Sequence, residues 1–507
     1  MKKPLLFTLL TVLVCLAPAL AGADDQARPS LSVAMQAFRP TLDPAIALAN
    51  VGFPLSIQMF DTLIYRDMST NQEGTGNVLK PGLARSWERL DDLTLELKLR
   101  PGLTFHNGEP LTAEDVRFSF ERILAPDSKY TWAKTQLSNI DRVEVKDDLT
   151  VRVVTKKPDA VLINLLAYMA TAIVPKDYFQ KVGFEAFGQK PVGSGPYRLV
   201  KYRAKELVEF EPFDQWYGGR PPLAKLTIKV IPEVSARITA LANNEVQIIN
   251  SIPPDQLSAV EKLESCRILS TPVNHHLINY RTAHPAMADK KLRQALNLAI
   301  DRRLLADTLW GGRATVSHGH QYPEWGQLYN PDRPRFAYDP DKAKKLLKES
   351  GYQGQELIFT THPVYYTNGL AAAQAVTEMW RRIGARIKLK VDENWYANSL
   401  KDESIAIRNI SDWLVIADPH VTILWSWAVS SQWTDNDRFK ELGQEAMSTL
   451  ETGKRLEIYQ QMLDMFEEEA PGTVLYRAQE FYGVKKNLDW RPYMYFMEFR
   501  PGHIKIN

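Results

Sequence analysis

The sequence predicts an α/β protein assembled from more than one domain, and three observations support this prediction. Short runs of alternating apolar and polar residues in the first third of the chain predict β-strands that are buried on one side. Helical patterns that alternate with single strands in the second half predict an α/β layer. The chain has 507 residues, which at about 150 residues per domain corresponds to about three domains.

The chain begins with the pattern of a secretory signal peptide. Lys2 and Lys3 precede the apolar run 5–16, and the small-residue stretch 17–23 follows it. The apolar run is shorter than the roughly 20 residues that a membrane-spanning helix needs. We therefore expect cleavage, preferably after Ala23, and a periplasmic mature protein rather than an anchored one.

The cysteine count and the charge balance restrict the function further. Cys15 lies inside the apolar run without the small residues that precede a lipid-attachment site, so we expect no lipid anchor. Cys266 is then the only cysteine of the mature chain, and we expect a packed small side chain and no disulfide. The net charge of +2 falls to zero without Lys2 and Lys3. This balance favours neither nucleic acid nor an anionic membrane as a partner.

The first third of the chain predicts strands and one helix. Four leucines that alternate with polar residues predict a half-buried strand: Leu93, Leu95, Leu97 and Leu99. The runs 143–145 and 149–153 flank Asp147-Asp148 and predict a hairpin. Between these strands, Thr112 and Asp115 form a variant capping box for a helix. The apolar stripe of this helix contains Val116, Phe120 and Ile123.

The second half predicts helices that lead into single strands. Five apolar residues fall on one helical face: Leu292, Ala295, Leu296, Ala299 and Ile300. A second helix is predicted to begin with Asp339 as N-cap and Pro340 in the first position, and to end at Gly351. A third stops at Gly384 and leads into the alternating strand 385–391, a helix-to-strand unit of an α/β layer.

The segment 99–116, LRPGLTFHNGEPLTAEDV, resembles a signature of the family 5 extracellular solute-binding proteins, the oligopeptide and dipeptide receptors and their relatives. The resemblance spans nearly the whole mature chain. Further matching segments follow in the family's order: Leu42-Asp43-Pro44, Phe60-Asp61-Thr62-Leu63, Pro81-Gly82-Leu83-Ala84, Val174-Pro175-Lys176, PVGSGPY at 191–197, LRQAL at 292–296 and Tyr338-Asp339-Pro340.

The resemblance implies an α/β fold with two lobes, the class II (cluster C) type of periplasmic binding protein, with an extra inserted domain. After the signal peptide at 1–23, we expect a discontinuous lobe 1 formed by 24–60, 179–277 and 476–507. The inserted domain is expected at 61–178 and lobe 2 at 278–475. The segment Phe481–Val484 is expected in one of the two strands that cross between the lobes.

The resemblance also implies a receptor of an ABC importer, which closes a hinge over a small ligand and delivers it to permease subunits in the inner membrane. We expect a peptide ligand, with a sugar, an opine or a metal chelate as alternatives. We further expect a monomer without a cofactor, and docking on a membrane sensor is compatible with this role. A secreted hydrolase is disfavoured, because Gly193-Ser194-Gly195-Pro196 lacks the spacing of a nucleophile elbow.

The densest group of candidate ligand-binding residues lies between positions 411 and 427. In peptide-binding relatives, the comparable segment carries an acidic residue a few places after a Trp, and this residue pairs with the ligand's amino group. Here Ile416 occupies the position three after the Trp. Either Asp412 or Asp418 substitutes for the missing acid, or the ligand lacks an ammonium group. The candidates are Asp412, Trp413, Asp418, Trp425 and Trp427.

Each candidate has a structural alternative. Asp418-Pro419 also fits a helix start, with Asp as the cap, and Trp413 fits a core. Phe53 follows the segment after which relatives place cleft residues of lobe 1, but loop packing explains it equally. Arg313 lies in a Gly-rich, aromatic segment and is a candidate partner for a ligand carboxylate, with a surface charge as the alternative.

Four histidines are possible metal ligands. His318 and His320 would share one side of an extended strand, and His275-His276 adds two imidazoles. No cysteine and no helical histidine pair accompanies them. We therefore expect structural roles for these histidines and no metal site.

Overall fold

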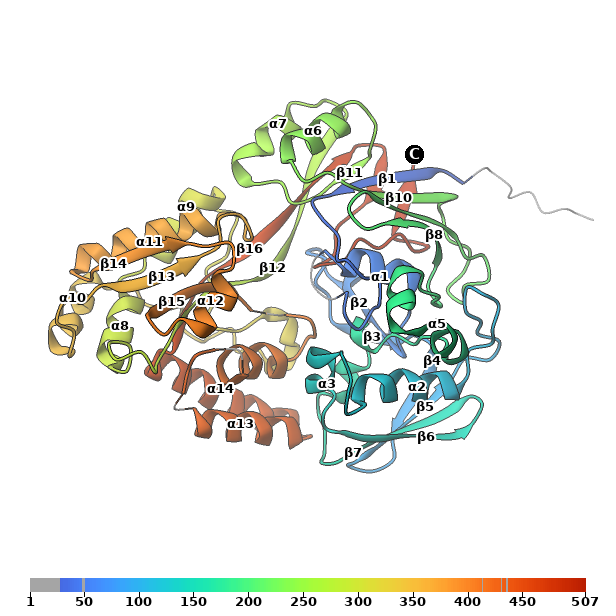
Figure 1. Cartoon of the computed structure of the whole chain (residues 1–507), viewed down its shortest axis with the longest axis horizontal. Helices are drawn as coiled ribbons and strands as arrows, with labels where there is room; N and C mark the ends of the chain where they lie inside the picture. Colours follow the sequence, from blue (N-terminus) through green and yellow to red (C-terminus); the bar gives the residue numbers. More distant parts are fainter. Residues whose placement is uncertain (1–27, 48–50, 413, 430, 435) are drawn as a thin grey trace, which may run out of the picture.

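One ten-stranded sheet runs through the part of the chain that the computed structural model describes, residues 28–47, 51–412, 414–429, 431–434 and 436–507. The predicted signal peptide and Cys15 lie outside these residues. The sheet joins two lobes that lie at opposite ends of the molecule (Figure 1). From edge to edge its strands are β14 (Ile387–Val391), β13 (Leu357–Thr361), β15 (Ile405–Ser411), β12 (Cys266–Tyr280), β16 (Gly472–Lys485), β11 (Ile248–Ile249), β1 (Ser30–Met35), β10 (Lys225–Val230), β9 (Leu207–Pro212) and β8 (Tyr197–Arg203).

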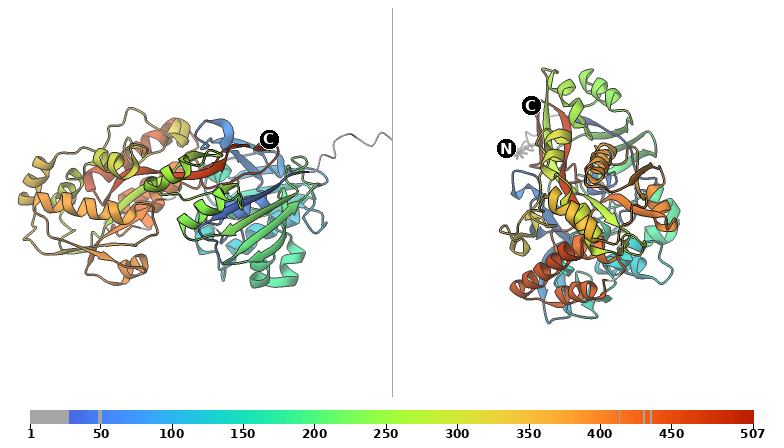
Figure 2. Two further views of the ribbon diagram at one scale, coloured as in Figure 1. Left: turned by 90° about the horizontal axis from the view of Figure 1, so that it is seen from above. Right: turned by 90° about the vertical axis from the view of Figure 1, so that its left-hand side faces the viewer.

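The two lobes are connected by the long strands β12 and β16, which cross the centre of the molecule together (Figures 1 and 2). These strands have 15 and 14 residues and pair in antiparallel register along most of their length. β15 pairs with β12 in one lobe, and β11 pairs with β16 in the other. The pairing shifts register between Pro272 and His275, midway along β12. The predicted crossing segment Phe481–Val484 lies in β16.

A separate four-stranded sheet lies below the first lobe in Figure 1, in the order β4 (Ala84–Arg89), β5 (Thr94–Leu99), β7 (Thr150–Thr155) and β6 (Ile140–Asp147). The alternation predicted for β5 is confirmed by the burial of Leu95, Leu97 and Leu99, whereas Leu93 precedes the strand and is exposed. The predicted hairpin is β6–β7.

The helix α2 (Ala113–Leu124) packs against β6 and β7. Its predicted capping box is present, since Thr112 donates its backbone N–H to the Asp115 carboxylate at 2.9 Å. The predicted apolar stripe of Val116, Phe120 and Ile123 is buried. This helix therefore forms where local sequence alone places it.

Helices cover the strands of the second lobe (Figure 1). As predicted, Asp339 caps one of them by accepting a hydrogen bond from Lys342 N, and Gly384 ends another with φ 104°. The helix capped by Asp339 ends at Glu349, just before the predicted Gly351. The helices are α8 (Lys290–Leu298), α9 (Arg302–Trp310), α10 (Pro340–Glu349), α11 (Gly369–Ile383), α12 (Trp395–Lys401), α13 (Asp437–Ser448) and α14 (Thr452–Glu469).

With one exception, a 14-residue helix at Lys176–Gln189, the remaining elements are short. They include the α-helices α1 (Phe53–Met59), α3 (Thr131–Gln136), α4 (Leu162–Leu165), α5 (Lys176–Gln189), α6 (Val234–Ala242) and α7 (Leu257–Glu261). Further strands are β2 (Ile64–Asp67), β3 (Val78–Pro81), β17 (Leu488–Trp490) and β18 (Ile504–Ile506). Single 3-10 turns occur at Met68–Thr70, Met169–Thr171, Pro254–Gln256 and Pro323–Leu328, and a π-helix, η5, spans His420–Val429. Within the described residues, no helix combines the length and the hydropathy that a membrane crossing requires.

The segments that carry the family resemblance meet one another at buried seams. His106 donates its backbone N–H to Gly193 O at 2.8 Å, and its ring Nε2 lies 2.9 Å from Gly195 O. A Cβ atom at Gly195 would lie 2.6 Å from the backbone at the end of α1, so only glycine permits this approach. Asp43 and Arg122 form a buried ion pair. Contacts of the landmark residues Asp43, His106, Gly193 and Gly195 therefore hold the four-stranded unit against the first lobe.

The domain boundaries remain a prediction. The four-stranded sheet and α2 fall within 61–178, and β13, β14 and β15 fall within 278–475. One buried apolar cluster continues from the first lobe into the 61–178 unit, with Phe60, Val116 and Phe210 among its members. The first lobe and this unit thus share a core.

Candidate ligand-binding cleft

The parallel strands of both lobes direct their carboxyl ends toward the middle of β12 and β16. In one lobe β1 runs parallel to β10 and β11, and in the other β13 runs parallel to β14 and β15. In open α/β sheets, ligands bind in the crevice beyond the carboxyl ends of the strands. This topology places the candidate cleft between the lobes, at the crossing strands.

Two cavities occupy this position and share Val273, Asn274 and Glu480 as lining residues. The larger has a volume of about 620 Å³ including its solvent-filled mouth, and the smaller about 360 Å³. The register shift in β12 lies at Val273 and Asn274, so the irregular backbone faces the cavities. The larger cavity takes further lining residues from the strand ends of both lobes: Gln36, Ser251, Ser411 and the loop Val364–Thr367.

One wall of the larger cavity is aromatic. The rings of Tyr365 and Tyr366, in the loop after β13, have centroids 4.7 Å apart, and Trp395 of α12 lies 5.2 Å from Tyr365. Tyr366 also packs against His276 of β12. Val364 is 81% exposed and Tyr365 is 55% exposed. An aromatic wall of this kind is typical of pockets for small ligands.

Glu480 of β16 is the only Asp, Glu, Lys or Arg among the residues, all within the described chain, that line the two cavities. The backbone N–H and the hydroxyl of Ser251 both donate to Glu480 Oε1, at 3.0 and 2.8 Å. Burial raises the pKa of Glu480, and the hydrogen bonds from Ser251 oppose this effect. The cavities therefore contain one formal negative charge when Glu480 is ionised.

The predicted residue Asp412 is buried behind the cleft in a closed hydrogen-bond network. Its carboxylate accepts hydrogen bonds from His275 N at 2.9 Å, His320 Nε2 at 2.6 Å and the Tyr322 hydroxyl at 2.7 Å. Burial alone would raise the pKa of Asp412, but the hydrogen bonds and charges of His275 and His320 hold it well below its ordinary value. The carboxylate is 1% exposed and lines neither cavity.

His275, His320 and Asp412 are close enough together to hold a metal ion. The indole N–H of Trp427 donates to His320 Nδ1 at 2.6 Å, which puts the ring proton on Nε2, where it is donated to Asp412. Both ring nitrogens of His320 are thus committed to protein partners. The expectation that His318 and His320 share one side of a strand is wrong, because the segment around them is not a strand. The Nδ1 atom of His318 lies 2.7 Å from the backbone oxygen of Arg333.

His275 also connects Asp412 to Ser317. Its Nδ1 lies 3.3 Å from Asp412 Oδ2, and its Nε2 lies 2.6 Å from Ser317 Oγ. This order of contacts is that of a Ser-His-Asp triad. Burial lowers the pKa of His275 to about 4, and Ser317 lines neither cavity. The Ser317 hydroxyl is thus not part of the lining of either cleft cavity.

The predicted residue Asp418 is held by α14. Arg455 donates to both carboxylate oxygens of Asp418, at 3.0 and 2.9 Å, and the pair is buried. Asp418 also accepts a hydrogen bond from His420 N at the start of η5, as the capping alternative requires. Ile416 is 2% exposed and belongs to the apolar core of the first lobe and the 61–178 unit.

The predicted tryptophans have different surroundings. Trp427 is fully buried and packs against Phe466 of α14, with ring centroids 4.4 Å apart. Trp425 is partly buried and packs against Trp132 of α3, with ring centroids 6.2 Å apart, so it contacts the opposite half of the molecule. Trp413 lies outside the described residues.

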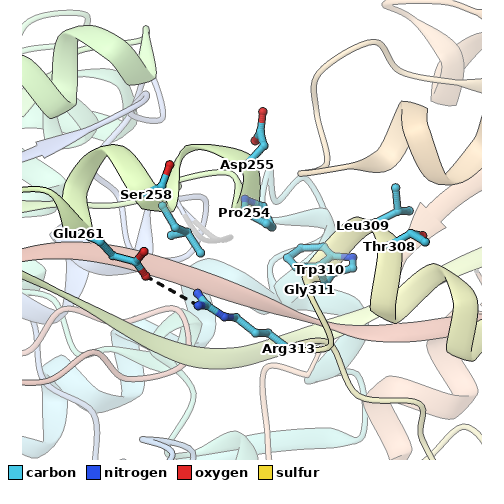
Figure 3. A pocket seen from close by; sticks show the side chains of 10 residues that line it. Pro254, Asp255, Ser258, Glu261, Thr308, Leu309, Trp310, Gly311 and Arg313 are labelled. Carbon is cyan, nitrogen blue, oxygen red and sulfur yellow. Dashed lines mark ion pairs between the residues drawn. The ribbon is translucent and has the colours of Figure 1, made fainter.

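The predicted residue Arg313 lines a different groove, between α7 and the end of α9 (Figure 3). It pairs with Glu261 at 3.8 Å and lies over the ring of Phe481, 5.7 Å from its centroid. Successive side chains of a strand point to opposite faces, so Phe481 and the cavity-lining Glu480 face opposite sides of β16. Arg313 is therefore on the face away from the cleft cavities.

The predicted residue Phe53 begins α1 and is 2% exposed. Its ring packs against Tyr168, Tyr495 and Phe496. The next residue, Pro54, lines the smaller cavity. Phe53 thus lies directly behind the cavity wall.

Sequence reasoning missed the aromatic wall and Glu480. Tyr365 and Tyr366 follow an apolar strand by four residues, a position at which the α/β pattern predicts a cleft loop. Glu480 directly precedes the predicted crossing segment Phe481–Val484. The positions of Tyr365, Tyr366 and Glu480 beside predicted strands were thus visible in the sequence, but none of these residues belongs to a recognisable motif.

The comparisons with known proteins agree with this geometry. The family model of the bacterial extracellular solute-binding proteins, family 5 (middle region), matches residues 78–435. The dipeptide-binding protein of Escherichia coli (strain K12) is 28% identical over 465 residues, which cover 84% of this chain and 85% of that protein. The glutathione-binding protein GsiB of Salmonella paratyphi A is 30% identical over 380 residues, which cover 74% of this chain and 69% of that protein.

A solved structure shows the same fold. The periplasmic binding protein DppA from Helicobacter pylori, in complex with the peptide STSA, is 22% identical and has a TM-score of 0.81, covering 94% of this chain and 98% of that chain. The predicted two-lobed α/β fold is confirmed. On the family match and this architecture together, the chain belongs to the bacterial extracellular solute-binding proteins, family 5.

Proposed function

We propose that this protein captures a short peptide in the cleft at β12 and β16 and delivers it to the permease subunits of an ABC importer in the inner membrane. The two relatives described above are named as a dipeptide-binding and a glutathione-binding protein, which supports a peptide-like ligand. Export to the periplasm, with removal of residues 1–23, belongs to the same proposal.

The observation that carries this proposal is a cavity lined from both lobes at the carboxyl ends of their parallel strands. Its aromatic wall, Tyr365 and Tyr366, suits side chains, and its exposed strand ends offer backbone partners for a peptide. Because the ligand contacts both lobes only when they meet, it stabilises the closed form.

Contacts between the halves support closure as the binding step. Asn77 donates to Glu324 O at 2.7 Å, and Ala160 N donates to Met447 O at 2.9 Å. Together with the Trp132–Trp425 contact, these join the 61–178 unit to the second lobe. Each is made by surfaces that hinge opening would separate.

A peptide panel tests the proposal. Trialanine, Met-Leu and glutathione are titrated while melting temperature and tryptophan fluorescence are recorded, and a bound ligand raises the melting temperature. Solute retained through purification is identified by mass spectrometry in parallel. The peptide assignment would be wrong if no peptide bound and the retained solute were a sugar, an opine or a metal chelate. That solute would then be assigned as the ligand.

We propose that the protein performs no chemistry on its ligand, because Ser317 lies outside the cleft cavities. The same peptides should be recovered intact after prolonged incubation. Turnover that is lost in Ser317→Ala would instead establish a hydrolase built on Ser317, His275 and Asp412.

The predicted residues retain a place in the proposal according to their surroundings. Trp425 contributes to closure through Trp132, and Trp413 stays a candidate for direct contact. Asp412 supports the cleft floor through His275, which lines the larger cavity. Substitution to alanine and measurement of peptide affinity test each one.

A further inference from the structure

Glu480 is the acidic group that the cleft presents to a ligand. It lines both cavities, whereas the carboxylates of Asp412 and Asp418 are occupied by protein groups and line neither. The position at which peptide-binding relatives carry an acid holds Ile416, which is buried in an apolar core. The residues lining the cavities thus offer one place for a positive charge.

Ser251 holds Glu480 in a fixed orientation. Both hydrogen bonds from Ser251 end on Oε1, and Oε2 receives no hydrogen bond from any described residue. Ser251 has φ 54°, a left-handed conformation that is strained for a non-glycine residue. The backbone therefore keeps a strained residue at the one position that orients this carboxylate.

No protein cation neutralises Glu480 directly among the described residues. The charge of Arg237 in α6 lowers the pKa of Glu480, but the Arg237 guanidinium donates its hydrogen bonds to the backbone oxygens of Ile231, Pro232, Asn250 and Ser251. Arg237 thus fixes the loop that carries Ser251. Partial burial without an ion-pair partner makes the ionised carboxylate costly, and a bound cation would remove that cost.

We propose that Glu480 receives the positively charged group of the ligand, the α-ammonium of a peptide. The proposal rests on the peptide function and assigns the orientation of the ligand: its amino end lies at the crossing strands, and its side chains face Tyr365 and Tyr366. Glu480 is a specificity-determining residue on the hinge strand, and Ser251 is its positioning residue.

The test compares each peptide with its N-acetylated form in the wild type and in Glu480→Gln. For trialanine, Met-Leu and glutathione, acetylation should weaken binding to the wild type by about 10- to 100-fold, the range of a charge-assisted hydrogen bond. In Glu480→Gln the free and acetylated forms should differ by no more than about threefold. Ser251→Ala should retain part of the wild-type preference, because the backbone N–H still holds Oε1.

Glu261→Gln is the matched control. Glu261 lies in the groove of Figure 3, away from the cleft cavities, and its removal should preserve the wild-type preference for a free amino group. The melting temperature of ligand-free Glu480→Gln checks that the variant is folded. Retention of the wild-type preference in Glu480→Gln would overturn this proposal while leaving the peptide function in place. Failure of all peptides to bind the wild type would overturn both.

Discussion

Asp412 shows how a side chain can look like a ligand-binding residue in the sequence and serve the framework in the fold. It joins the carboxyl end of β15 to β12 and to the 317–322 segment through His275, His320 and Tyr322. Because all partners are buried, the charge is compensated only while the whole network is intact. The network supports the cavity from behind.

Asp412→Asn should destabilise the protein by about 3 kcal/mol, because it removes a buried charge that several donors share. The measurement is the free energy of unfolding in urea at neutral pH. Asp332→Asn, at an exposed position, is the control and should change stability little. A variant as stable as the wild type would show that the network is not essential to the fold.

The pH dependence of binding tests the charge of Glu480. The groups that face it are Arg237, His275, His276, Tyr482 and Tyr495. Burial lowers the pKa of His275 and His276 to about 4 and raises the pKa of both tyrosines well above its ordinary value. As the pH falls from neutral, Glu480 is therefore the first of these groups whose charge changes, because burial raises its pKa.

Since burial raises the pKa of Glu480, the carboxyl group gains a proton at a higher pH than an exposed glutamate does, and it then no longer attracts an ammonium group. Affinity for trialanine should fall in the wild type as the pH is lowered from neutral, and it should stay constant in Glu480→Gln. Titration calorimetry at several pH values measures it. Parallel curves for the two proteins would exclude Glu480 as the source of the dependence.

The sequence predicted which segment lies at the cleft better than it predicted which side chains of that segment are available to a ligand. The 411–427 segment does lie between the lobes. Its two carboxylates, however, bind protein groups that are distant in sequence: Asp412 binds His275 and His320, and Asp418 binds Arg455. Single-sequence patterns carry no information about such pairing. Glu480 and Tyr366 were missed because a cleft is assembled from isolated residues at strand ends.

At the level of elements, local signals were sufficient where they were complete. The capping box of α2, the Asp339-Pro340 start of α10 and the Gly384 end of α11 all form as predicted. The segment around His318 and His320 is not a strand, because its side chains are fixed by Arg333, Asp412 and Trp427 rather than by a neighbouring strand. Tertiary contacts decided that segment.

The crossing strands combine two roles in one element pair. The register shift at Val273 and Asn274 interrupts the ladder midway between the lobes, where hinge motion must be absorbed, and it turns these residues toward the cavities. Ligand contact and hinge angle are therefore linked through β12.

Asn77→Ala tests the contribution of a contact between the halves. It removes the hydrogen bond to Glu324 O, and affinity for the bound peptide should fall about fivefold, the equivalent of one net hydrogen bond. The dissociation rate should account for most of the change. Asn107→Ala, within an exposed turn, is the control. Unchanged affinity in Asn77→Ala would show that this contact does not contribute to closure.

On the scale of the whole molecule, acid should destabilise the protein. His275 and His276 are buried, and burial lowers their pKa to about 4 from an ordinary value of 6.5. In this window the unfolded chain binds protons that the folded chain does not, so stability is full above about pH 6.5 and falls toward pH 4. Each residue contributes up to ~3 kcal/mol.

Urea unfolding at several pH values between about 7 and 5 measures this dependence. His276→Gln should show a shallower loss of stability, because one of the two groups no longer titrates. Stability that stays constant over the range would mean that both imidazoles protonate as easily in the folded protein as in the unfolded chain.

Ligand capture by this protein requires that the two lobes meet around the ligand at the crossing strands. Single-molecule energy transfer between dyes at Lys129→Cys and Lys345→Cys measures the approach of the halves directly, since both side chains are exposed and the native Cys266 is 3% exposed. Saturating peptide should move the population to a shorter distance, with a midpoint equal to its dissociation constant. A single unchanged distance distribution while the peptide is bound would contradict closure.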